Sequence, residues 1–149
     1  MAEYSTELHN LFFPHFEKSD VELLLPLMEE VNLKAGDALF CLNEGGEELF
    51  LVMKGRLAVQ KKTGFGDRTQ VVALLGPGAP VGERFSLSDN FHGATVVAVG
   101  DSAVLSFSSK AYGKLKEEHP LLAVSLLEWL LDRTSLRLRK NSDRLSHVL

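Results

Sequence analysis

The sequence has very little cysteine, which limits how the chain can be stabilised. Cys41 is the only cysteine among the 149 residues. A single thiol excludes a disulfide within the chain and is typical of proteins that fold in a reducing compartment. Apolar residues make up 45% of the chain, which is enough for a buried core at this length. We therefore expect a soluble, cytoplasmic protein that is stabilised by its core.

Long hydrophobic runs are also absent. The N-terminal segment MAEYSTELHNLFF contains acidic residues and no extended apolar stretch, so it does not resemble a secretory signal. The leucine-rich segment 121–131 is interrupted by Ser125 and Glu128, and it is too short to span a bilayer. We therefore expect no membrane segment.

An excess of positive charge is missing as well, because 20 acidic residues outnumber 16 lysines and arginines. A negative net charge argues against general affinity for nucleic acids, which bind basic surfaces. Several cations do gather near the C-terminus: Arg133, Arg137, Arg139, Lys140 and Arg144. We interpret them as a solvated helix face that complements the helix dipole.

The sequence lacks the short motifs of metal sites and of nucleophilic enzymes. The five histidines are scattered without a His-x-His or similar spacing, and Cys41 has no second cysteine beside it. No local motif arranges a serine nucleophile. We therefore predict no metal site, no catalytic residue, no cofactor and no enzymatic activity.

What the chain does contain is a set of short β-strands between two helical segments. Residues 5–30 show helical spacing, and Ser19–Glu22 has the Ser-x-x-Glu form of a capping box. Residues 31–108 alternate short apolar runs with turn-forming residues, and residues 109–149 return to helical spacing. This order predicts one α+β domain over 1–149. Its antiparallel β-roll or jelly roll (a double-stranded β-helix) is flanked by N-terminal helices and a long C-terminal helix.

The C-terminal helix is expected to begin at Pro120, which suits a first-turn position. It would be about 45 Å long at 1.5 Å per residue. Residues at alternating steps of three and four form a heptad seam: Val124, Leu127, Leu131, Thr134, Leu138, Asn141, Leu145 and Val148. Such a seam predicts a homodimer through the helix at 120–149. The alternative is a monomer whose helix folds back on its own domain or frays at its end.

Three stretches of the chain together resemble the cyclic nucleotide-binding domain family, with the β-roll of its catabolite activator protein-like members. Residues 33–59, LKAGDALFCLNEGGEELFLVMKGRLAV, resemble the first half of that roll. Residues 81–99, VGERFSLSDNFHGATVVAV, resemble the phosphate-binding cassette of the family. Residues 107–120, FSSKAYGKLKEEHP, resemble the helix after the roll. The resemblance covers most of the chain and implies the β-roll fold.

The family cassette usually reads Phe-Gly-Glu-Leu-Ala-Leu and, after a short connection, Arg-x-Ala-x-Val. In the family the glutamate holds the ribose 2′-hydroxyl, the arginine pairs with the cyclic phosphate, and backbone amides of a short helix complete the anion site. Gly82 and Glu83 match this pattern, as does the strand that begins near Ala94. The ligand-binding residues that the resemblance implies are Gly82, Glu83, Arg84, Phe85, His92, Gly93, Ala94 and Thr95.

Three residues of the cassette depart from the family pattern. His92 stands where the phosphate-binding arginine is expected, and an imidazole with a pKa of about 6.5 is mostly neutral at pH 7. Loss of the charge-assisted contact costs about 1.5–3 kcal/mol, which is at least about tenfold in affinity. Phe85 replaces a small residue, so its ring is expected either to crowd the phosphate or to join the core. Arg84 replaces a leucine and compensates for His92 only if its side chain turns inward.

The resemblance implies a non-catalytic regulatory module that senses a cyclic nucleotide, cyclic AMP or cyclic GMP, and signals through the C-terminal helix. The alternative is a degenerate site in a constitutive scaffold for dimerisation or for binding an unidentified protein partner. Because the chain ends at Leu149, no DNA-binding domain is expected after the helix. Selection of the base would depend on side chains near the cassette and around residues 134–141 of the helix.

Overall fold

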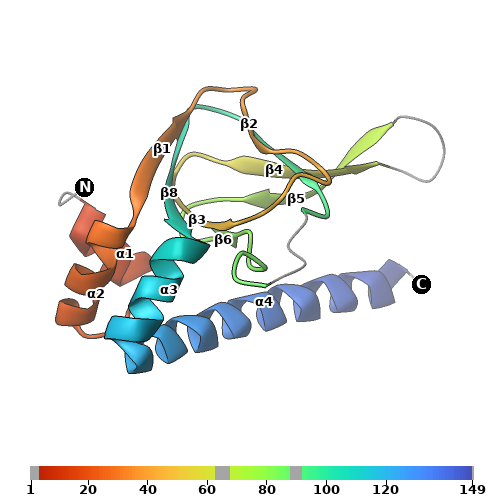
Figure 1. The fold of residues 1–149 in the computed structure, drawn as a ribbon. Helices are drawn as coiled ribbons and strands as arrows, with labels where there is room; N and C mark the ends of the chain where they lie inside the picture. The colour runs from red at the N-terminus through yellow and green to blue at the C-terminus, as the bar shows by residue number, and fades with distance from the viewer. Residues whose placement is uncertain (1–3, 63–67, 88–91, 149) are drawn as a thin grey trace.

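The computed structural model describes residues 4–62, 68–87 and 92–148, with side chains as far as Ser146. Figure 1 shows a β-roll with short helices at one side and a long helix passing beneath it. The helices are α1 (Ser5–Leu11), α2 (Lys18–Leu24), α3 (Ser109–Glu118) and α4 (Pro120–Val148), with a 3₁₀ turn at Leu25–Leu27. The strands are β1 (Glu29–Leu33), β2 (Ala38–Phe40), β3 (Glu48–Lys54), β4 (Leu57–Lys62), β5 (Thr69–Leu75), β6 (Pro80–Val81), β7 (Thr95–Ala98) and β8 (Ser102–Ser108).

The strands form two sheets in which the recorded strand pairs are antiparallel. The first sheet has the order β1-β8-β3-β6, and we call it the helix-side sheet because the helices cover its outer face. The second sheet has the order β2-β7-β4-β5, and we call it the cavity-side sheet. The two sheets and their flanking helices confirm the predicted α+β β-roll.

Alternate residues of the helix-side sheet point into two separate cores. Phe50 and Val52 of β3 point inward, into the core between the two sheets. Leu49 and Leu51 point outward, into a second core that also contains Phe107 of β8 and the buried faces of the helices. Because side chains alternate along a strand, an unbroken apolar run in β3 fills both cores at once.

The N-terminal helices differ in one detail from the sequence prediction. The capping interaction lies at Glu17, whose backbone amide donates to the carboxylate of Asp20 at 3.2 Å. Ser19 is already inside α2, so the predicted capping box at Ser19–Glu22 is wrong. Two overlapping polar pairs have the same spacing of three residues, Glu17 with Asp20 and Ser19 with Glu22, and the helix is capped by the first pair. β1 also begins slightly earlier than predicted, at Glu29.

The two C-terminal helices begin where local signals place them. The hydroxyl of Ser108 accepts a hydrogen bond from the amide of Ala111 at 3.0 Å and so caps α3. α4 begins at Pro120, as expected from the preference of proline for the first helical turn. Its first half buries Leu122 and Leu126 in the second core, between the helices and the helix-side sheet, which we call the helix-side core. Of the described helices, none is both long and apolar enough to cross a membrane.

The predicted heptad seam on α4 is exposed along much of its length. The side chains of Leu131 and Leu138 are 68% and 70% exposed. Thr134 is half-buried, and its hydroxyl donates to the carbonyl oxygen of Leu130 at 2.9 Å. The side chain of Val148, the last member of the seam, lies outside the described residues. Dimerisation through this seam stays a prediction.

Candidate functional site

The cassette begins at a glycine whose backbone conformation few other residues adopt. Gly82 has a φ of +83°, in the left-handed region that favours glycine. A Cβ atom at this position would lie 2.6 Å from the carbonyl oxygen of Glu48 at the start of β3. β6 pairs with β3 through Val81 and Phe50. Gly82 therefore turns the chain out of the helix-side sheet directly before Glu83.

The segment after Gly82 forms turns. The amide of Phe85 donates to the carbonyl of Gly82 at 3.1 Å, and the amide of Leu87 donates to the carbonyl of Arg84 at 3.0 Å. The short helix that the resemblance implied is not formed over residues 83–87. The rest of the connection, 88–91, lies outside the described residues.

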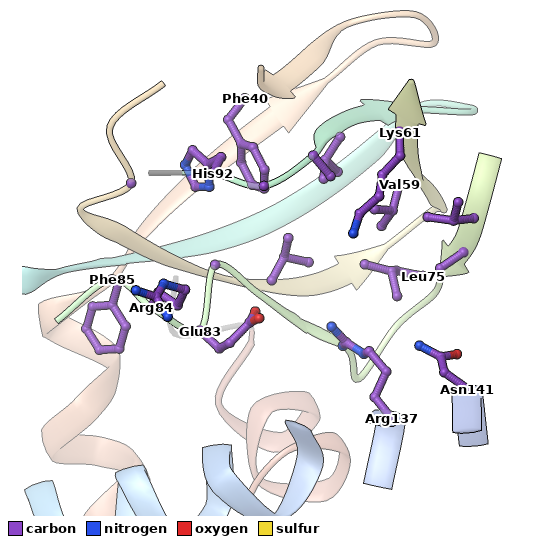
Figure 2. Close-up of a pocket in the computed structure, with 18 of the residues that line it drawn as sticks. Phe40, Val59, Lys61, Leu75, Glu83, Arg84, Phe85, His92, Arg137 and Asn141 are labelled. Atoms are coloured by element: carbon purple, nitrogen blue, oxygen red, sulfur yellow. The ribbon is translucent and has the colours of Figure 1, made fainter. Parts of the chain in front are cut away.

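Phe85 joins the core, which was one of the two expected outcomes. Its side chain is 1% exposed, and its ring packs edge-on against Phe107 of β8 and Tyr112 of α3, with centroids 5.9 and 5.6 Å away. In Figure 2 the ring points away from the centre of the cavity. The ring therefore does not crowd the ligand space, and it anchors the cassette to the helix-side core.

His92 is held against the opposite part of the roll. Its imidazole stacks on the ring of Phe40, with centroids 3.5 Å apart and planes 10° apart. Its backbone amide donates to the carbonyl of Glu44, and its carbonyl accepts from the amide of Asn43, both at 2.9 Å. Burial lowers the pKa of His92, and the charges of Glu44 and Glu83 offset this only in part. The imidazole is therefore mostly neutral at pH 7.

The cassette residues after His92 separate into two groups. Gly93 and Ala94 lie on the wall of a cavity beside the cassette. The hydroxyl of Thr95 instead accepts a hydrogen bond from the amide of Leu42 at 3.0 Å. Thr95 thus joins the end of β2 to β7, and it is the one predicted ligand-binding residue, among those the structure describes, that does not line the cavity.

The other predicted residues surround a cavity of about 600 Å³. This volume is within the usual range for small-molecule sites, about 300–1,000 Å³. Figure 2 shows the carboxylate of Glu83 directed into the cavity. The apolar part of the wall comes mostly from the β-strands and includes Phe40, Val59, Leu75, Val81 and Val96. An apolar cavity with a few polar groups is the usual form of a small-molecule site.

The cavity also has polar and cationic residues outside the cassette, of which only Arg137 and Asn141 lie in the helix segment 134–141 that was connected with base selection. Lys61 of β4 and Arg137, Asn141 and Arg144 of α4 line it. Figure 2 shows Lys61 and Arg137 projecting into the cavity from opposite sides. Arg137 is half-buried, so its interpretation as part of a solvated face is wrong, whereas Arg144 lines the cavity and is exposed as well. Helical spacing indicates that the three α4 residues share one face, but it does not indicate that this face meets the β-roll.

Arg137 also connects α4 to the strand that precedes the cassette. Its Nη2 atom donates to the carbonyl oxygen of Pro80 in β6 at 2.8 Å. Pro80 lies two positions before Gly82, so this hydrogen bond links the helix to the cassette turn. Asn141 lies within the helix segment that the resemblance connected with base selection, whereas the described contacts of Thr134 stay within α4.

The described residues provide no group of three or more His, Cys, Asp or Glu side chains that could hold a metal ion. Cys41 is exposed. Partial desolvation raises the pKa of the Cys41 thiol, and the carboxylate of Glu44 raises it further. A thiol with a raised pKa is a poor nucleophile at neutral pH.

Comparisons with known proteins identify the family of the chain. The family model described as "Cyclic nucleotide-binding domain" matches residues 30–119. The cyclic AMP receptor protein of Thermus thermophilus is 31% identical over 114 residues, which are 76% of this chain and 52% of that protein. Lysophospholipase nte1 of Aspergillus fumigatus is 26% identical over 106 residues, which are 71% of this chain and 7% of that protein. The chain thus spans about half of the first relative and a small part of the second.

A solved structure matches nearly the whole fold. The crystal structure of a cyclic nucleotide-binding domain from Methylobacillus flagellatus has a TM-score of 0.89 and 25% sequence identity, and the match covers 99% of this chain and 85% of that one. The family match includes the cassette and almost the entire β-roll. The chain belongs to the cyclic nucleotide-binding domain family.

Proposed function

We propose that the chain is a ligand-sensing regulatory module and that its ligand is a cyclic nucleotide, cyclic AMP or cyclic GMP. The observation that carries the proposal is the turn at Gly82, which directs the carboxylate of Glu83 into a largely apolar cavity of about 600 Å³. Family membership supports it, and the relative from Thermus thermophilus is named a cyclic AMP receptor protein.

Glu83 provides the acceptor for a ribose hydroxyl. A hydrogen bond to a charged group contributes about 1.5–3 kcal/mol, so this one contact accounts for a tenfold or greater effect on affinity. The apolar side chains of Val59, Leu75 and Val96 line the same cavity and would contact the flat faces of a base. The ribose is thus fixed at the cassette while the base is buried against the strands.

The phosphate is the weakest part of the proposed interaction. It would lie near His92, which is mostly neutral at pH 7 because burial lowers its pKa. Only a protonated imidazole attracts a phosphate as a cation. We therefore expect cyclic nucleotides to bind weakly at neutral pH and more tightly in mild acid.

Two contacts would carry a change at the cassette to α4. Phe85 packs against Tyr112 of α3, and α3 packs on α4. Arg137 of α4 is hydrogen-bonded to Pro80 just before the cassette. A ligand that moves the cassette changes both contacts, so the position of α4 is the expected output.

We also propose that α4 forms a homodimer through its exposed seam. Most of its members are apolar, and the part around Leu131 and Leu138 faces solvent in the single chain, whereas Asn141 and Leu145 further along the seam line the cavity. Two parallel copies of such a stripe bury each other in a coiled coil. A dimer would place the two cavities beside the same helix pair and couple them.

The experiment is calorimetric titration of cyclic AMP and cyclic GMP into the wild-type chain at pH 6 and pH 8. Trp129 is the only tryptophan. It lies on α4 and contacts Phe12 and Phe13 of the N-terminal segment, so its fluorescence reports movement of α4. We expect saturable binding and a change in this fluorescence. Glu83→Gln should weaken binding at least about tenfold, whereas Glu117→Gln, an exposed position on α3, should have no effect.

A scaffold without a ligand is the second candidate, and the neutral imidazole of His92 favours it. If folded, dimeric protein gives no heat with either cyclic nucleotide, the sensor proposal is wrong and the scaffold replaces it.

The similarity to lysophospholipase nte1 covers 7% of that protein and gives no support for catalysis by this domain, which belongs to a family of regulatory modules.

A further inference from the structure

The cavity has its strongest positive charge at the end formed by α4, away from the expected phosphate position. Arg137 and Arg144 are separated by two helical turns and line the cavity on the same face as Asn141. Lys61 approaches from β4, where it shares a strand face with Val59. In Figure 2 Lys61 and Arg137 point toward this end, whereas His92 lies with Phe40 at the other. We call Lys61, Arg137 and Arg144 the basic end of the cavity.

Among the described residues that line the cavity, positively charged side chains outnumber negatively charged ones. Apart from Arg84, which has an interaction of its own, the cationic residues are Lys61, Arg137 and Arg144, and the one carboxylate in the described wall is Glu83. The structure records no hydrogen bond or ion pair for the side chains of Lys61 and Arg144 with the residues it describes. Cations that converge on an apolar cavity repel one another, and a bound anion removes that cost.

The hydrogen bond of Arg137 leaves most of its capacity unused. A guanidinium has five N–H donors, and the contact with Pro80 uses the Nη2 group. This contact holds the side chain half-buried at the cavity, and the further N–H groups of the planar guanidinium can donate to an anion. Arg137 is therefore pre-positioned, whereas Lys61 and Arg144 are exposed side chains that can adjust to a ligand.

We propose that the basic end binds the phosphate chain of a linear nucleotide with at least two negative charges, which the same cavity accepts in addition to a cyclic nucleotide. This inference rests on the proposed function, because it places the sugar of either nucleotide at Glu83. The phosphate chain of the linear nucleotide then extends toward the basic end, whereas the phosphate of a cyclic nucleotide lies toward His92. The inference assigns Lys61, Arg137 and Arg144 as specificity-determining residues. It also places a ligand charge directly on α4, next to the hydrogen bond with Pro80.

The test compares adenine nucleotides of increasing charge as probes: cyclic AMP, AMP, ADP and ATP. Affinities are measured by calorimetry at pH 8 with a chelator present, so that no divalent cation neutralises the phosphates. The variants are Lys61→Gln and Arg144→Gln, with Lys62→Gln and Arg139→Gln as matched controls on the same strand and helix but outside the cavity wall. Circular dichroism checks that each variant is folded.

We expect ADP or ATP to bind at least about tenfold more tightly than cyclic AMP, because each added charge-assisted contact is of that size. Lys61→Gln and Arg144→Gln should each remove much of this advantage and leave cyclic AMP within about twofold of wild type, since cyclic AMP has no group at the basic end. The control variants should change neither affinity.

Two results would overturn the inference. If cyclic AMP binds and the more highly charged probes bind no better, or if Lys61→Gln and Arg144→Gln leave ADP binding unchanged, the basic end is not an anion site while the sensor proposal stands. If none of the probes binds the folded wild-type chain, the proposed function fails and this inference fails with it.

Discussion

The imidazole of His92 lies flat on the ring of Phe40, with centroids 3.5 Å apart. The stack holds the histidine at the cavity wall and removes part of its solvation, which is the main reason its pKa is lowered. The position where the family resemblance calls for a permanent cation therefore has a group whose charge depends on pH.

The first prediction is a pH dependence with opposite signs for stability and for binding. Because the pKa of His92 is lower in the folded chain than its ordinary value of about 6.5, the unfolded chain takes up the proton first. Stability is therefore full above about pH 6.5 and falls as the pH drops through the lowered pKa. A bound cyclic phosphate favours the protonated form, so cyclic AMP should bind more tightly over the same pH range.

Urea unfolding and calorimetry between pH 5 and pH 8 check both signs, with His92→Gln as the control. Glu44 and Glu83 are charged groups that face the imidazole, and both are unchanged in the control. The control should therefore remove the contribution of His92 to the pH dependence of stability and to that of cyclic AMP binding. Equal slopes in wild type and His92→Gln would assign the pH dependence to other groups.

The second prediction is that His92→Arg strengthens cyclic AMP binding at pH 8 by at least about tenfold, because it adds a permanent charge and a planar donor fork. The variant should also lose the pH dependence of binding. Calorimetry at pH 6 and pH 8 measures this. A variant that is folded and binds no better than wild type would show that the phosphate lies elsewhere.

The third prediction concerns Phe85, whose ring is buried against Phe107 and Tyr112. Phe85→Ala should lower the free energy of unfolding by about 3–5 kcal/mol, through the lost transfer energy and the cavity left behind. Phe85→Leu should cost less, about 1.5 kcal/mol or below. Urea unfolding measures both. If Phe85→Ala is as stable as wild type and binds ligand better, the ring does obstruct the cavity.

The fourth prediction contrasts two glycines. Gly82→Ala should destabilise the chain by at least about 1–2 kcal/mol, because alanine is strained at a positive φ and its Cβ would meet the carbonyl oxygen of Glu48 at 2.6 Å. Gly113→Ala in α3 should stabilise it by about 0.5–1 kcal/mol, since its Cβ meets nothing within 4 Å. Thermal unfolding of both variants checks the opposite signs. A neutral Gly82→Ala would mean that the cassette turn can relax.

The fifth prediction tests the seam on α4. Replacing both Leu131 and Leu138 by Gln should raise the dissociation constant of the homodimer at least about tenfold, because each buried leucine contributes about 1.5–3 kcal/mol. Leu136→Gln, on the same helix outside the seam, is the control and should have little effect. Sedimentation at several protein concentrations measures the equilibrium. A wild-type chain that stays monomeric at the highest concentration would reject the dimer.

Much of the fold follows from local patterns, and most of what was missed depends on tertiary contacts. The strand and turn alternation over 31–108 and the start of α4 at Pro120 can be read from the chain. The pairing of Arg137 with Pro80 cannot, because the two residues are 57 positions apart and no local pattern connects them. The same is true of Lys61, whose role depends on how the strand face meets α4.

Within the cassette, the limits of sequence reading come from backbone geometry and from overlapping signals. The pattern of residues 82–87 is compatible with a helix or with successive turns, and the structure has turns, with Phe85 in the core. Thr95 fits the family pattern, but its hydroxyl is used by the amide of Leu42. At α2, two polar pairs of equal spacing compete, and the sequence does not rank them.

The position of β3 between two cores has a consequence for how the chain tolerates substitution. From Leu49 to Met53 every residue is buried, so this strand has no solvent face on which polar residues can be exchanged freely. In β5, by contrast, most positions are exposed. A saturation library should therefore find that almost no position in the middle of β3 tolerates polar residues, whichever of the two cores its side chain enters. Most positions of β5 should tolerate many different residues. Strand β3 is thus the part of the chain that tolerates the fewest substitutions, and changes to the ligand preference of the cavity have to be made elsewhere.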